Sequence, residues 1–127
     1  MIATPRFHTP RTPGSRTLGG KYAKIATAMG RRPHEWQQRA ADVIYELDDN
    51  GRFRYRNVYV SVPRQCGKTV MAMGLGMTRL MLQGDAKVWY TAQTGQAARE
   101  RWLKECATPV SNRLGPIAEV RKGAGDT

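Results

Sequence analysis

The chain has 127 residues, enough for one domain with a hydrophobic core and too few for two. Lysine and arginine number 21 against 10 acidic residues, so the net charge of +11 favours a polyanionic partner, with a basic surface that binds nothing as the alternative. There is no apolar run of about 18 residues and no signal-peptide core. These absences exclude a membrane-spanning protein, and we expect a soluble, intracellular one.

The first stretch, residues 1–17, is rich in proline, threonine and serine and carries only positive charges, on Arg6, Arg11 and Arg16. Such a composition is typical of an extended or disordered segment. The stretch therefore predicts a basic arm that lies on DNA phosphates, or a solvated tail without a partner. We place the boundary of the folded part at residue 18.

Two helices are expected next. Gly20–Met29 has apolar residues on one face, and His34–Leu47 has a stripe in which Trp36, Ala40 and Val43 recur at helical spacing. The run 48–51 then predicts a turn. Residues 52–56 alternate arginine with aromatic residues, which indicates an exposed edge strand with its arginines outward. The same alternation could hold single-stranded nucleic acid.

A short β-forming run, Val58–Val62, ends at Pro63, and an apolar helical stretch begins at Val70. Between them lies Gly67-Lys68-Thr69, and strand, loop, Gly-Lys-Thr and helix is the layout of a phosphate-binding loop. Backbone N–H groups would bind phosphate oxygens, Lys68 would add a charge, and the Thr69 hydroxyl would ligate Mg²⁺. The full pattern has glycine where Val62 stands, so the alternative is a plain strand-to-helix turn.

A second strand is expected at Lys87–Ala92, after the helix that ends near Leu82. The helix between two strands predicts a right-handed βαβ unit with parallel strands. Thr94 is a good N-cap for an amphipathic helix that runs to about Asn112. Ile117–Val120 resembles the start of a third strand. The predicted fold class is thus α/β, a parallel sheet with flanking helices.

Several features together resemble the large terminase subunit of tailed phages, an ATP-driven motor that packages DNA. The loop Arg64-Gln65-Cys66-Gly67-Lys68-Thr69 matches that family's phosphate-binding loop, which often lacks the first glycine. Trp36-Gln37 matches its upstream aromatic–glutamine pair, after a Leu-Gly segment and a short helix. The polar turn and Gln-Ala pair within 92–97 match a further motif. The resemblance spans about residues 18–105.

The resemblance implies a RecA-like P-loop NTPase fold and ATP hydrolysis coupled to translocation of double-stranded DNA. Lys68 would stabilise the transferring phosphoryl group, and Arg64 would sense the γ-phosphate or act as an arginine finger. Thr69 would bind Mg²⁺, and Gln65, Cys66 and Gly67 would complete the loop around ATP. Gln37 would read the adenine edge, with Trp36 packed nearby. Implied partners are a portal and a small terminase subunit, in the cytoplasm of the infected host cell.

The same comparison shows which parts of the family pattern the chain lacks. The family's apolar strand ending in Asp-Glu is missing, as is its nuclease domain. We therefore expect residues 18–127 to be the first portion of an ATPase domain, inactive alone and completed by a missing half. Two alternatives remain: a fragment of a helicase-like ATPase, and a non-enzymatic basic nucleic-acid-binding protein with a decayed loop.

Overall fold

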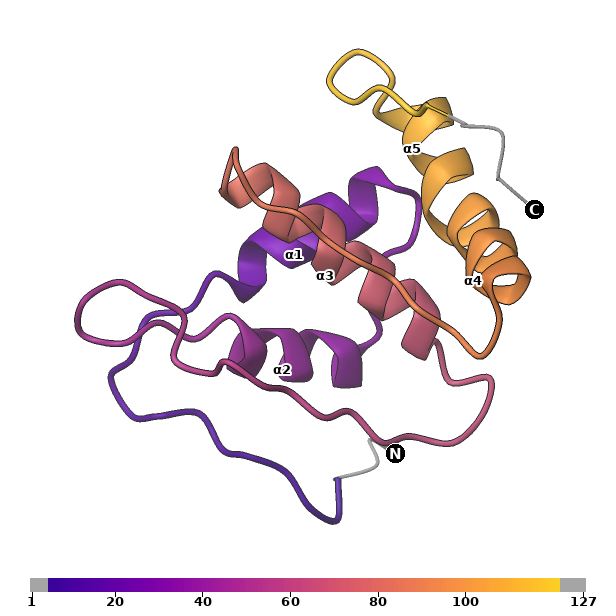
Figure 1. The fold of residues 1–127 in the computed structure, drawn as a ribbon. Helices are drawn as coiled ribbons and strands as arrows, with labels where there is room; N and C mark the ends of the chain where they lie inside the picture. The colour runs from indigo at the N-terminus through magenta and orange to yellow at the C-terminus, as the bar shows by residue number, and fades with distance from the viewer. Residues whose placement is uncertain (1–4, 122–127) are drawn as a thin grey trace.

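The computed structural model describes residues 5–121, and over these residues the chain is built from helices (Figure 1). Two expected helices, near residues 20–29 and 70–82, appear within two residues of their predicted limits. The expected helix at 34–47 ends three residues early, at Ile44. The helical segments are α1 (Gly19–Ala28), α2 (Glu35–Ile44), α3 (Lys68–Leu82), α4 (Gly95–Trp102), η1 (Leu103–Ala107) and α5 (Thr108–Arg113).

The predicted α/β fold with a parallel, RecA-like P-loop sheet is wrong for this structure. Residues 5–121 contain only two isolated antiparallel bridges, Thr17 with Glu46 and Leu47 with Phe53, and no sheet. The expected strands at Val58–Val62, Lys87–Ala92 and Ile117–Val120 are not strands. A strand is held by a ladder to a neighbour, and within the described residues these segments have none.

The centre of the molecule is the packing of α1 against both α2 and α3 (Figure 1). Gly74 on α3 lies so close to α1 that a Cβ there would be 2.9 Å from the Tyr22 ring. Close packing at this glycine was expected, but against a sheet; its partner is a helix. The buried cluster at this junction consists of Tyr22, Ala26, Ala41, Tyr45 and Met71.

A second cluster joins α1 and α3 to the C-terminal helices, and it contains Met29, Met77, Val110 and Leu114. The expected single helix from Gln93 to Asn112 is instead α4, η1 and α5 in succession. Its predicted cap is confirmed, because the Thr94 hydroxyl accepts a hydrogen bond from the Ala97 N–H at 3.1 Å. The widened π turn of η1 lies just before Pro109, whose ring disfavours α-helical geometry around the carbonyl of Glu105.

The face of α3 that was predicted to be buried is buried only in part. Met73 and Met77 are buried, but Leu80 and Met81 at the end of α3 are exposed. The latter two were expected to lie on the sheet. Because no sheet covers this end of α3 among residues 5–121, their side chains face solvent.

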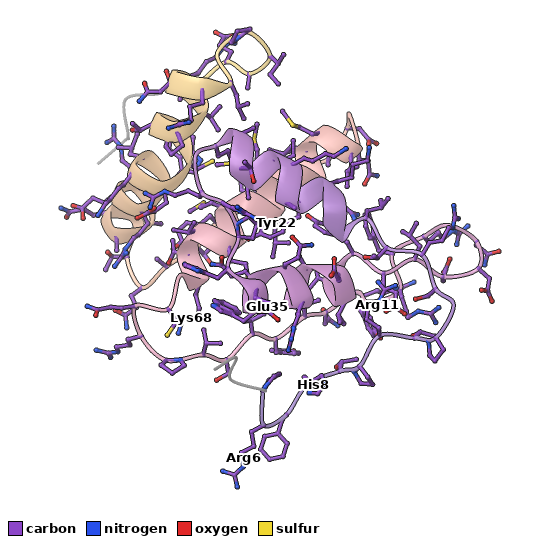
Figure 2. All side chains as sticks on the ribbon, turned by 180° about the vertical axis from the view of Figure 1, so that it is seen from behind. Arg6, His8, Arg11, Tyr22, Glu35 and Lys68 are labelled. Atoms are coloured by element: carbon purple, nitrogen blue, oxygen red, sulfur yellow. The ribbon has the colours of Figure 1, made fainter. Side chains whose placement is uncertain are left out.

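A buried carboxylate attaches the N-terminal segment to the helices. Glu46 is 0% exposed, accepts hydrogen bonds from the Thr12 N–H, and lies 3.0 Å from Arg54 and 3.6 Å from Arg11 (labelled in Figure 2). The hydrogen bonds from Thr12 hold the pKa of Glu46 below its ordinary value, against the opposing effect of desolvation. Residues 11–17 therefore pack on the domain. Arg54, expected to point outward, faces this carboxylate.

The predicted turn at 48–51 is confirmed. The Asp48 carboxylate accepts hydrogen bonds from the N–H groups of Asn50 and Arg52, both at 2.9 Å, and Gly51 has a φ of 74°. Among the described helices, none is long and apolar enough to cross a membrane.

Candidate phosphate-binding site

The loop before α3 has an unusual backbone. Gln65 has a φ of 62° and Gly67 a φ of 87°, both left-handed, while Cys66 between them has a negative φ. Alternation of this kind turns successive N–H groups toward one side and forms concave anion-binding sites. A left-handed conformation is uncommon for a residue with a side chain, so Gln65 is held by its surroundings rather than by its own preference.

The first turn of α3 carries free hydrogen-bond donors. The helical ladder begins with the Met71 N–H, which donates to the Gly67 carbonyl at 3.0 Å. Gly67 is the N-cap residue and has no side chain with which to cap the helix. Within residues 5–121, the N–H groups of Lys68, Thr69 and Val70 thus lack a partner. Such groups and the positive end of the helix dipole attract anions.

Gln37 on α2 holds this loop in place. Its side chain is 3% exposed; its Nε2 donates to the Gly67 carbonyl at 3.1 Å, and its Oε1 accepts from the His34 N–H at 2.8 Å. A Cβ on residue 67 would lie 2.8 Å from that Nε2. A glycine at 67 is therefore required twice, by its left-handed φ and by the approach of Gln37.

A cavity of about 480 Å³ lies between α2 and the loop. None of the residues that line it is acidic. Its cationic side is Arg31 and Arg32, and Arg31 also donates to the buried Glu105 of η1 at 3.3 Å. The lining residues are Arg31, Arg32, His34, Trp36, Gln37, Gln65, Cys66, Gly67 and Val70.

The site residues expected from the sequence are placed as follows. Trp36 and Gln37 line the same cavity as Gln65, Cys66 and Gly67, although about thirty positions separate the two groups. Lys68 stands at the start of α3 (labelled in Figure 2), and its Nζ donates to the Val62 carbonyl at 2.8 Å. Arg64 and Lys68 are exposed and Thr69 is half-buried, and none of the three lines the cavity.

Gln37, expected to bind the adenine edge, is already engaged in hydrogen bonds within the chain. Both ends of its amide already make hydrogen bonds inside the chain, which leaves one N–H and one lone pair for a ligand. Its observed contacts make it a residue that positions the loop. Trp36 packs on the core, as expected, and also lines the cavity.

Sequence reasoning missed Arg31 and Arg32 as site residues. The pair lies between α1 and α2, directly before Pro33, and the pair itself is part of no ligand-binding motif. Only the fold shows that it faces the loop at 65–67. The sequence does carry one signal: Arg31-Arg32 precede Trp36-Gln37 by five positions. A ligand bound at Trp36-Gln37 therefore lies near an arginine.

The donors present suit phosphate, whereas the support for a metal is limited to one hydroxyl. Within the described residues no group of three or more His, Cys, Asp or Glu side chains could hold a metal ion. Mg²⁺ takes oxygen ligands and commonly keeps waters and substrate phosphates in its shell. The Thr69 hydroxyl is the only metal ligand that the resemblance implies from this chain, and nucleotide phosphates would have to complete the shell.

Comparisons with known proteins returned no match: no family model, curated protein or solved structure matches this chain. The resemblance to terminase large subunits accordingly remains an inference from the motifs at 36–37 and 64–69.

Proposed function

We propose that this chain binds a nucleotide, with ATP as the ligand and Mg²⁺ as its counter-ion, at the cavity between α2 and the loop 64–69. The finer proposal, carried by the motif resemblance, is the ATP-binding part of a DNA-packaging motor. The proposal concerns the loop and the residues around it. It does not include the parallel-sheet fold, which the structure contradicts.

One observation carries the proposal: Trp36 and Gln37 lie against Gln65–Gly67 in a single cationic cavity. The loop was identified from its own residues, and the aromatic–glutamine pair was singled out through the family resemblance. Their meeting supports a ligand with a planar base and a phosphate chain. The base would pack near Trp36, and the phosphates would approach the free N–H groups at the start of α3.

Each basic group has a distinct part in this proposal. Lys68 would exchange the Val62 carbonyl for a phosphate oxygen, which is a stronger, charge-assisted hydrogen bond. Arg32 makes no ion pair in the described part of the chain and is available to a phosphate. Arg31 is steadied by Glu105 and would add a second charge. Arg64 stands outside the cavity and would approach the terminal phosphate from the solvent side.

The site supports binding better than turnover. Hydrolysis needs an acidic residue that orients water and completes the Mg²⁺ shell, and none lines the cavity. We therefore expect steady-state phosphate release by this chain to stay below about 1 s⁻¹, the lower end of ordinary enzyme rates. Double-stranded DNA, a portal and a small terminase subunit are partners proposed on the resemblance alone.

The test is calorimetric titration of the protein with Mg²⁺-ATP. Lys68→Ala should weaken binding by about 10-fold or more, the value of one charge-assisted hydrogen bond of about 1.5–3 kcal/mol. Lys87→Ala, at an exposed lysine outside the cavity, removes the same charge and should leave the affinity within about twofold. AMP should bind more weakly than ATP. Equal ATP affinity for wild type and Lys68→Ala would refute the proposal.

A further inference from the structure

A second, larger cavity lies along the C-terminal half of α3. Its volume is about 820 Å³. Its walls come from four places: the C-terminal end of α2, the segment that follows the turn at 48–51, the C-terminal half of α3, and the two extended segments represented by Val58 and Val88. It shares no lining residue with the phosphate cavity, so any ligand here is independent of the nucleotide proposed above.

The charge of this cavity is positive and uncompensated. Arg52, Arg56 and Arg79 line it, and no acidic residue does. In the described residues none of these three forms an ion pair. Arg54, which lies between Arg52 and Arg56 in the sequence, differs because the buried Glu46 neutralises it. The chain thus separates one structural arginine from three whose charge remains available.

The apolar part of the cavity offers flat and aliphatic surfaces. Arg79 lies over the Phe53 ring, 4.0 Å from its centroid, and the other neighbour of that ring is Tyr45, at 5.5 Å between centroids. Phe53 is therefore part of the wall. Tyr55 lines the cavity, is half-buried and has no aromatic ring partner among residues 5–121. Val58 and Val88, 45% and 46% exposed, extend the apolar surface.

We propose that this cavity binds single-stranded nucleic acid, with a base against Tyr55 and the aliphatic wall and backbone phosphates on Arg52 and Arg56. Arginines beside an aromatic face are the combination that holds a single strand, since every base has a flat face and every linkage a charge. Charge complementarity favours this occupant over an apolar peptide. A duplex is disfavoured because its bases are already stacked on one another and cannot enter a cavity of this size.

Fluorescence anisotropy with a labelled oligothymidine strand and the full chain tests the proposal. The double variant Arg52→Ala/Arg56→Ala should bind at least about 10-fold more weakly, and the salt slope should fall by about 0.7 for each lost phosphate contact. Arg99→Ala/Arg101→Ala, at exposed arginines of α4, removes the same charge elsewhere and should bind within about threefold of wild type. Circular dichroism of both variants checks that the helices are retained.

Substitutions of Tyr55 test the stacking of a base separately from the charge of the cavity. Tyr55→Phe keeps the ring and should retain affinity within about twofold, whereas Tyr55→Leu should lose about fivefold or more. Lys68→Ala should leave oligonucleotide binding unchanged, which separates this cavity from the nucleotide site. An equal loss in both arginine double variants would overturn the proposal. Equal or tighter binding of a duplex of the same length would overturn it as well.

Discussion

The loop at 64–69 and the extended segments around Tyr59 and Trp89 behave differently, although both were predicted from local sequence. The loop is in place, with Gln37 donating to the Gly67 carbonyl and α3 beginning at Lys68. The extended segments have no ladder within the described residues, and Tyr59 and Trp89 are 94% and 85% exposed. A glycine, a capping position and one buried glutamine suffice for a loop. A strand needs a neighbour that its own residues cannot supply.

We expect the largest loss of stability from truncation of Tyr22, a residue of α1 that is 1% exposed and faces α3. Tyr22→Ala should lower the free energy of unfolding by about 3–5 kcal/mol, as is usual when a large buried aromatic residue is truncated. Trp89→Ala removes an even larger ring but should change stability by less than about 0.5 kcal/mol, because that ring is in solvent. Urea denaturation of both variants provides the measurement.

A large loss for Trp89→Ala would break the comparison, since it would show that the segment around residue 89 is packed in solution.

The next effect is a loss of stability at alkaline pH. Burial raises the pKa of Tyr22 and of Tyr45 from 10.0 to about 12, so the folded state favours both neutral phenols. Their contribution is fully present below pH 10 and is lost as the pH rises from about 10 to about 12. The urea midpoint should fall across this window. The decline should be shallower in Tyr22→Phe/Tyr45→Phe, which has neither ionisable group.

An identical decline in that double variant would show that Tyr22 and Tyr45 do not cause the alkaline loss, and that the helical junction is looser than described.

A smaller effect is expected at the loop itself. Gly67→Ala places a side chain at a φ of 87° and 2.8 Å from the Gln37 amide, which should cost about 1–2 kcal/mol of stability and abolish measurable ATP binding. Gly84→Ala is the matched control, because a Cβ there meets nothing within 4 Å. Thermal unfolding together with nucleotide titration separates the two variants. Normal ATP binding by Gly67→Ala would show that this backbone geometry is not needed.

How far the sequence could predict the structure depends on the range of each interaction. The helices followed from apolar spacing and from local caps such as Thr94, whose hydrogen bond to Ala97 spans three residues. The meeting of Trp36-Gln37 with the loop was foreseen only through the family resemblance. The role of Glu46 and the inward turn of Arg54 were not foreseen, because their contacts join residues 11–12, 46 and 54.

The strand predictions were wrong because a strand depends on a pairing partner that is distant in sequence. Val58–Val62 and Lys87–Ala92 have strong β propensity, but propensity describes how a residue fits a sheet that already exists. Nothing in the alternation of those residues specifies which segment would pair with them. The same reasoning applies to Leu80 and Met81, which were expected to be covered by that sheet and are exposed.

The most direct test of the central claim is nuclear magnetic resonance of the backbone amides during titration with Mg²⁺-ATP. The account predicts saturable shifts of the Lys68, Thr69 and Val70 amides together with the indole of Trp36, while the exposed indole of Trp89 stays unchanged. The first three amides are the unpartnered donors of α3, and Trp36 lines the adjoining cavity. Saturable shifts elsewhere with no change at residues 68–70 would contradict the account.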